Sequence, residues 1–300
     1  MKNVRVLIVF VCFLAAMNIT SADTIRGINI DFVTIGHAGN VGDTRTGTDE
    51  WGQPLANPYG CGAVSYNYRI GKYEVTNAQW NAFTTVAGAP TGNPSYAYDQ
   101  SAYWTGTDVP TNRVSWYEAA QFCNYLTSGN KSLGAYQLHT NGSITVNRAS
   151  AISSFGIAYV IPTEDEWYKA AYFKPDGSGY SLYANGTDTA PIASVQSNYN
   201  EVIDSPWNVG TGTVEQNGTF DMMGNVWEWN ETLIDSSYHG IRGGSYNTNG
   251  GPGYYLISST RSYVTTYNED PTVGFRVASV PEPATLLLLS LGVVMLRKKR

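Results

Sequence analysis

The stretch VSWYEAAQFCNYL, at Val114–Leu126, carries the pattern that starts a helix. Ser115 and Glu118 form an S-x-x-E box, in which the hydroxyl accepts from a free backbone N–H and the glutamate reaches back to the N–H of the cap residue. Apolar residues follow directly, among them Phe122 and Leu126. The stretch therefore predicts a helix that begins just after Ser115.

Two further boxes of this kind lie on either side of that stretch. Thr76 and Gln79 form a T-x-x-Q box, and Thr163 and Glu166 form a T-x-x-E box. Each box stands before a run of aromatic and small apolar residues. Because a box satisfies backbone donors that would otherwise be left unpaired, helix starts are expected at both places.

Strand signals surround the predicted helices. Residues 64–70 alternate between apolar and polar positions, which is typical of a strand. Residues 32–35 predict one edge strand. Within 136–147, the pair Asn141-Gly142 lies between apolar residues and predicts a hairpin.

The remainder of the chain has few periodic patterns. Residues 177–218 are dense in Gly, Asn, Asp, Pro and Ser and predict a long irregular stretch. Short strands are expected near 226–229, 243–246 and 274–277. The predicted fold class is α+β, loop-rich, with short helices and antiparallel strands.

The N-terminus has the layout of a secretory signal peptide. Lys2 and Arg5 precede an apolar run over 6–17, and small residues precede a cut after Ala22. The alternative is a membrane anchor that stays attached, but the run is shorter than the roughly 20 residues that span a bilayer. Residues 1–22 are therefore interpreted as a signal peptide, removed by signal peptidase.

Composition argues against a nucleic-acid partner and for one domain. Charged residues make up 14% of the chain and the net charge is −6, so no basic surface for phosphates is expected. Of the three cysteines, Cys12 lies in the signal peptide. Export permits a disulfide between Cys61 and Cys123, and two buried free thiols are the alternative.

Six strings occur along the chain in a fixed order. They are GKYEVTNAQWNAF (71–83), VSWYEAAQFCNYL (114–126), IPTEDEWYKAAYF (161–173), DMMGNVWEW (221–229), RGGSY (242–246) and GFRVA (274–278). In this order they resemble the formylglycine-generating-enzyme, or sulfatase-modifying-factor, domain over residues 64–279, after a lead-in segment over 23–63. That resemblance implies a C-type-lectin-like core with little regular secondary structure.

Most residues of these strings have simple structural interpretations. Arg242 and Arg276 are interpreted as ties between loops. The tryptophans of the motifs are interpreted as core aromatics rather than ligand platforms: Trp80, Trp116, Trp167, Trp227 and Trp229.

The C-terminus, VPEPATLLLLSLGVVMLRKKR, resembles the PEP-CTERM signal of Gram-negative bacteria over residues 280–300. In that family, exosortase recognises the Pro-Glu-Pro and removes the tail. The resemblance implies transient membrane anchoring through a short transmembrane helix, then sorting to the cell surface or extracellular matrix, often alongside exopolysaccharide production. A simple C-terminal anchor is the alternative, since four cations after an apolar run stay cytoplasmic.

The resemblance also locates the family's redox centre. Active members hold copper with two cysteines shortly after the GGS of RGGSY, and the matching positions here are Thr248 and Gly253. Copper(I) is a soft ion that needs thiolate ligands. Copper is therefore not expected, and no catalytic residue is assigned.

Structural calcium is the cofactor that the resemblance implies. Mixed carboxylate and backbone oxygens suit this hard, flexible cation. Turn hydrogen bonds of Asp and Asn are the alternative. One set maps to Asp221, Gly224, Val226 and Glu228, and a second set maps to Asn198, Tyr199 and Asp204, with Pro206 as a further member.

The sequence thus favours an exported, surface-sorted protein that acts as a non-catalytic binding or matrix module, with exopolysaccharide or another surface ligand as its partner. One alternative is an oxidoreductase related to formylglycine-generating enzyme. Another is a structural protein whose role is display alone.

Overall fold

The computed structural model describes residues 21–45, 60–249 and 253–281. A five-stranded antiparallel sheet in the order β1-β2-β3-β11-β6 joins the two ends of this region. Its strands are β1 (Ser21–Ile25), β2 (Ile28–Ile35), β3 (Tyr68–Gly71), β6 (Ile157–Val160) and β11 (Ala278–Pro281).

A second sheet of four strands has the order β10-β7-β8-β9. The pair β10–β7 is parallel, whereas the other pairs are antiparallel. A separate hairpin forms around Asn141-Gly142, as predicted. The strands are β7 (Trp227–Asp235), β8 (Tyr238–Arg242), β9 (Ser262–Thr265) and β10 (Val273–Gly274), with β4 (Tyr136–Leu138) and β5 (Ile144–Val146) in the hairpin.

The three predicted helix starts are confirmed. Helices α1 (Asn77–Ala87), α2 (Trp116–Ser128) and α4 (Glu164–Tyr172) each begin with a complete capping box. Helix α3 (Arg148–Phe155) is an addition to the prediction, because its N-cap Asn147 has no Glu or Gln partner to mark it in the sequence. A short 3₁₀ turn covers Ser95–Ala97.

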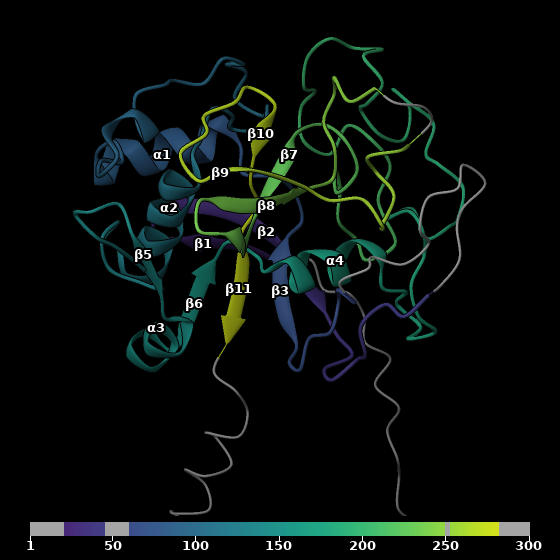
Figure 1. Cartoon of the computed structure of the whole chain (residues 1–300), viewed down its shortest axis with the longest axis horizontal. Helices are drawn as coiled ribbons and strands as arrows, with labels where there is room; N and C mark the ends of the chain where they lie inside the picture. Colours follow the sequence, from purple (N-terminus) through teal and green to yellow (C-terminus); the bar gives the residue numbers. More distant parts are fainter. Residues whose placement is uncertain (1–20, 46–59, 250–252, 282–300) are drawn as a thin grey trace, which may run out of the picture.

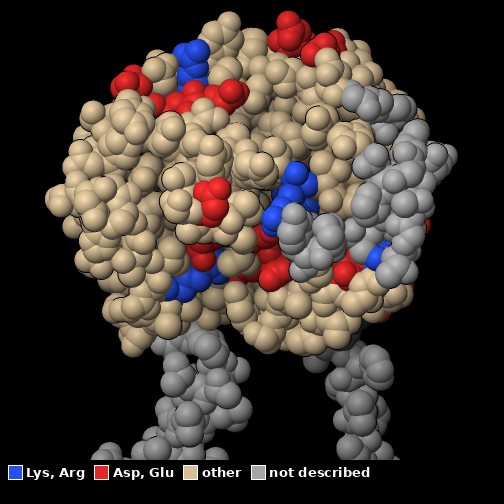
Figure 2. Space-filling view, in the orientation of Figure 1, with Lys and Arg blue, Asp and Glu red and all other residues tan. Residues whose placement is uncertain are grey.

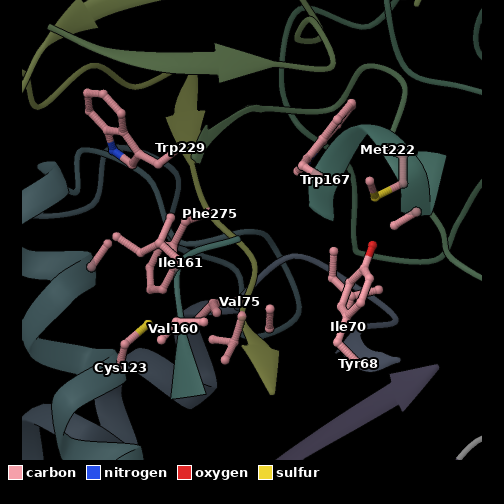
Figure 3. Packing of buried hydrophobic residues seen from close by; sticks show 14 of the residues in the cluster. Tyr68, Ile70, Val75, Cys123, Val160, Ile161, Trp167, Met222, Trp229 and Phe275 are labelled. Atoms are coloured by element: carbon pink, nitrogen blue, oxygen red, sulfur yellow. The ribbon is translucent and has the colours of Figure 1, made fainter. Parts of the chain in front are cut away.

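Helices and loops occupy different sides of the molecule. Figure 1 shows α1, α2 and α3 gathered on one side and the irregular chain after α4 on the other. On the helical side, rings of Trp80, Phe83, Phe122 and Phe275 pack edge to face or stacked, with centroids 5.3–6.3 Å apart. Figure 3 shows Phe275 and Cys123 within this apolar packing, which aromatic burial stabilises.

Some strand predictions differ from the structure. Strand β2 is an interior strand rather than an edge, because β1 pairs with its outer side. Residues 243–246 form no strand, since Gly243 and Gly244 have φ angles of +99° and +77° that turn the chain away. The irregular stretch over 177–218 contains no helix or named strand, as predicted.

The predicted lead-in, residues 23–63, supplies β2 and most of β1 to the main sheet. Of the predicted signal peptide, residues 1–20 lie outside the described residues, as does the tail over 282–300 with its predicted transmembrane helix. Among the residues that are described, no helix has the length and apolar content to cross a membrane.

Candidate functional site

The loop after β8 contains Thr248, the first of the two positions that the sequence resemblance matches to copper-binding cysteines. Thr248 lies in a tight turn, where its hydroxyl oxygen accepts from the Ser245 N–H at 2.8 Å and lies 3.0 Å from Ser245 Oγ. A hydroxyl in this place makes turn hydrogen bonds, but it is a hard oxygen and a poor ligand for copper(I).

The second position is closed to any side chain. Gly253 has a φ of +74°, and a Cβ atom there would lie 2.9 Å from Tyr183 Cε1 and 3.0 Å from Ala190 Cβ. A cysteine at this backbone position is therefore both strained and blocked by its neighbours. The residues present at the two positions do not fit the copper that active family members carry.

An open groove of about 350 Å³ lies beside Thr248. Its wall combines two aromatic side chains and three asparagines with the aliphatic side chains of Ile241, Val264 and Val273. Trp227 is half-buried here, with its ring 5.8 Å from that of Tyr255, so the prediction of a core role holds only in part for this tryptophan. Other members of the wall are Asn247, Asn249, Asn268, Asp270 and Thr272.

Next to Trp227 in the chain, the carboxylate of the predicted calcium ligand Glu228 forms an ion pair with Arg276. The Arg276 guanidinium donates to both carboxylate oxygens, at 2.5 and 2.6 Å, and the Trp167 indole N–H donates at 2.7 Å. Neither charged group is exposed. Arg276 also donates to the backbone carbonyls of Gly71 and Phe220, which confirms its role as a tie between loops.

Asp221 lies close to this pair and also has partners. Its carboxylate accepts from the Trp207 indole N–H at 2.9 Å and from the Gly210 N–H at 2.7 Å. The buried Glu74 accepts from Asn225 and from the N–H of Val226, at 2.7 and 3.2 Å. Sequence reasoning missed Glu74, because it lies about 150 residues before the motif that it contacts.

Four carboxyl groups, those of Glu228, Glu74, Glu215 and Asp221, interact with the Arg276 guanidinium. Burial raises the pKa of Glu74 well above its usual range, and the neighbouring carboxylates of Asp221 and Glu228 raise it further. Burial also raises the pKa of Glu215 to about 8 and that of Asp221 above its ordinary value. Protonation of these groups or a bound cation would relieve the excess of buried negative charge.

The second predicted calcium set adjoins the first. The Asn198 carbonyl accepts from the Asn225 N–H at 2.8 Å, so the two sets meet at this backbone. Asn198 is fully buried, and its Oδ1 has no hydrogen-bond donor among the described residues. Such an orphaned oxygen fits a cation ligand. Tyr199 donates its hydroxyl to Pro191, and Asp204 lies on an exposed turn.

Across the described part of the chain, the predicted calcium sets included, no group of three or more His, Cys, Asp or Glu side chains is arranged to hold a metal. The three histidines bond to separate partners, at Pro175, Thr145 and Thr266.

The structure corrects the predicted disulfide. Cys61 and Cys123 are both buried free thiols. Cys61 Sγ lies 3.9 Å from Arg242 Nη2 in a charged region, whereas Cys123 belongs to the apolar face of α2. The alternative of two buried free thiols is therefore the arrangement seen.

Comparison with known proteins assigns the chain to a family. The sequence profile of the sulfatase-modifying factor enzyme 1-like domain matches residues 39–280. The chain belongs to this family. The profile of the PEP-CTERM protein-sorting motif matches residues 279–300. The chain is thus an exported sulfatase-modifying-factor family protein whose sorting motif implies surface sorting in a Gram-negative bacterium and processing by exosortase.

Curated relatives are distant from this sulfatase-modifying-factor domain. The chaperone protein LppX of Paenibacillus barcinonensis is 25% identical over 185 residues, or 54% of this chain and 61% of that protein. The hercynine oxygenase of Mycolicibacterium smegmatis is 25% identical over 173 residues, or 56% of this chain and 38% of that protein. The chain therefore spans less than two thirds of the length of either relative.

Solved structures confirm the fold. Treponema denticola variable protein 1 superposes with a TM-score of 0.59 at 21% identity, covering 89% of this chain and 100% of that one. CarF superposes with a TM-score of 0.60 at 20% identity, covering 85% and 99%. The predicted α+β, C-type-lectin-like formylglycine-generating-enzyme fold is the fold of this chain.

Proposed function

We propose that this protein is a non-catalytic binding module of the cell surface or extracellular matrix, and that the groove beside Thr248 is its ligand face. The observation that carries the proposal is the closure of position 253 against Tyr183 and Ala190. At the position matched to the second copper-binding cysteine the chain is closely packed, while an open groove lies beside the first matched position, Thr248.

The groove has the chemistry of a polar binding face. The rings of Trp227 and Tyr255, which meet edge to face, offer apolar surface, and Asn247, Asn249 and Asn268 offer amide donors and acceptors. A few convergent polar groups among aromatic side chains are typical of ligand sites. Hydroxyl-rich polymers such as exopolysaccharide match these groups, because their hydroxyls bond to amides and their C–H faces pack on rings.

The test compares binding with oxidation in the purified exported protein. We expect the protein to bind the exopolysaccharide of its own host, to retain no stoichiometric copper, and to leave a cysteine-containing sulfatase peptide unchanged. Asn268→Trp should block the groove and weaken the binding. Consumption of oxygen with aldehyde formation in the peptide would instead establish the oxidoreductase alternative. If the protein does not bind the polysaccharide, the proposal is wrong, and the remaining alternative is a structural protein whose role is display alone.

Structural calcium is a second part of the proposal. The excess of buried carboxyl groups around Arg276 and the orphaned Asn198 Oδ1 both favour a cation between the two predicted sets. Calcium bound there would neutralise charge and hold irregular loops together. Thermal unfolding of the wild type and of Asn198→Ala, with calcium and with a chelator, tests it.

A further inference from the structure

A second cavity, of about 370 Å³, lies between the start of α1, the start of α2 and the loop over residues 89–113. It shares no lining residue with the groove beside Thr248. Its wall contains one tryptophan, several amides and hydroxyls, one cation and one carboxyl group. None of these residues belongs to the predicted calcium sets or to the redox positions.

The buried amide of Asn77 supplies an unused acceptor in this wall. Asn77 is 5% exposed, and its Nδ2 donates to the backbone carbonyls of Trp104 and Gly106 at 2.8 and 2.9 Å. Two carbonyl partners fix which end of the amide is the NH₂ group. The opposite atom, Oδ1, has no donor among the described residues, and leaving a buried acceptor unpaired costs about 1–3 kcal/mol. That oxygen is itself closed to solvent, so the amide fixes the wall of the cavity rather than contacting a ligand directly.

Trp80 supplies a flat wall that is held in place. Its ring stacks on Phe122 with centroids 5.9 Å apart and planes 20° apart, and it meets Phe83 edge to face at 5.3 Å. The side chain is nevertheless only half-buried and lines the cavity. A preordered indole offers apolar surface without losing rotamer freedom on binding.

The charges of the cavity favour a neutral ligand. Arg113 is the one cation among the lining residues, and its guanidinium is held 5.0 Å above the Tyr103 ring. Burial and the nearby Glu269 carboxylate together raise the pKa of Glu118 to about 8, so Glu118 is largely protonated at neutral pH. The Glu269 carboxylate, Asp99 beside it and the single tethered cation make a poor phosphate or sulfate site.

The rest of the wall also consists of uncharged hydrogen-bonding groups. Gln100 and Ser101 are exposed at the rim, and Asn81 and Thr84 lie on the same side of α1 as Asn77. Figure 2 shows that most of the surface in that view carries no charged side chain, in keeping with a protein that meets its partners through neutral polar groups.

We propose that this cavity is a second binding site, which takes one or two sugar residues of a neutral polysaccharide, with a sugar C–H face packed on Trp80 and sugar hydroxyls bonded to the uncharged polar groups of the wall. The class of ligand rests on the proposed function, but the site is separate from the groove. Two sites on one module would bind one polymer more tightly than either site alone.

The experiment uses the purified exported protein and short neutral gluco-, manno- and galacto-oligosaccharides, with binding measured by calorimetry. Asn77→Ala removes two internal hydrogen bonds, so its effect on binding would not separate the site from the fold. Ser101→Trp is therefore the decisive variant, because Ser101 is exposed at the rim and an indole there fills the cavity. Ser154→Trp, on the exposed face of α3, is the matched control.

At least one neutral series should bind to the wild type and to Ser154→Trp, and Ser101→Trp should weaken that binding at least about tenfold with an unchanged melting temperature. Equal binding by Ser101→Trp and by the wild type, or binding only of uronic-acid oligosaccharides, would overturn the inference.

The two blocking variants also distinguish the two sites. If exopolysaccharide binding is lost in Asn268→Trp but kept in Ser101→Trp, the groove is supported and the second site is not. The opposite outcome has two parts: Ser101→Trp weakens the binding of short oligosaccharides, and Asn268→Trp leaves the binding of exopolysaccharide unchanged. In that case the second site is supported and the groove is not the ligand face.

Discussion

The two sides of this molecule hold their chain in different ways. The helical region, formed by α1, α2 and α3 with β6, is held by regular backbone hydrogen bonds and by stacked aromatic rings. The loop region, formed by residues 173–226 and the turn after β8, has almost no regular structure and is held by buried ion pairs and amides. Backbone groups that no helix or strand satisfies must find side-chain partners, and charged ones are the strongest.

Buried arginines show this most clearly. Arg276 joins Glu228 to two backbone carbonyls, and Arg242 joins Glu164 to the carbonyls of Ser258 and Thr260. Neither arginine is exposed. Each arginine therefore links several loops through its side-chain hydrogen bonds, as backbone hydrogen bonds link the strands of a sheet.

The largest expected effect comes from breaking that arrangement. Arg276→Met leaves the Glu228 carboxylate buried without its cation, and the free energy of unfolding should fall by about 3–5 kcal/mol. Denaturant unfolding measures it. Arg69→Met is the control, because the Arg69–Asp23 pair is 30% and 26% exposed and is worth at most about 1 kcal/mol. Equal losses from the two variants would show that the loop region does not depend on its buried pair.

Calcium should stabilise the loop region and leave the helical region unaffected. At a free calcium concentration about 100 times the dissociation constant, the free energy of unfolding should rise by about 2.7 kcal/mol. Thermal unfolding with calcium and with a chelator measures the gain. Asn198→Ala, which removes the orphaned oxygen, should abolish it, whereas Asn130→Ala on an exposed turn should not. A calcium effect that persists in Asn198→Ala would show that the residues of the second set do not bind the ion.

The pH dependence of stability should report on both regions separately. The pKa of Glu118 in the helical region and that of Glu215 in the loop region are each raised to about 8. Because the folded state binds these protons more tightly than the unfolded state, stability falls as pH rises from about 5 to about 8, by at most about 1.4 kcal/mol per pH unit for each group.

Two variants separate the contributions of Glu118 and Glu215 to the dependence of stability on pH. Glu118→Gln and Glu215→Gln should each remove one part of it, and calcium should reduce only the part that belongs to Glu215. Unfolding curves at several pH values measure the slope. A slope that neither variant changes would assign the dependence to other buried carboxyl groups.

The smallest predicted effect concerns a cap in the helical region. Ser115 accepts from the Glu118 N–H and donates to the Ala97 carbonyl at 2.7 Å. Ser115→Ala should lower the free energy of unfolding by about 1–2 kcal/mol. Ser154→Ala, on the exposed face of α3, should change it by less than about 0.5 kcal/mol. If Ser115→Ala lowered the free energy of unfolding as much as Arg276→Met does, the helical region would depend on its cap as strongly as the loop region depends on its buried ion pair.

Much of the helical region can be predicted from the sequence, because its signals are local. A capping box needs residues only three positions apart, and all three boxes locate their helix starts to the residue. The hairpin at Asn141-Gly142 is equally local. Helix α3 has no such signal, because Asn147 caps it without the second half of a box.

By itself, the sequence determined the family, the helix starts, the sorting motif and the absence of thiols at positions 248 and 253. Only the tertiary structure decided that Gly253 is closed by Tyr183, that Glu74 and Glu215 join Asp221 around Arg276, and that Asn77 has an unpaired oxygen in the wall of a cavity. The physical reason is the separation along the chain between the residues that determine each feature. Caps and turns depend on neighbours in the chain, whereas buried charge and cavities depend on residues that meet only when the chain is folded.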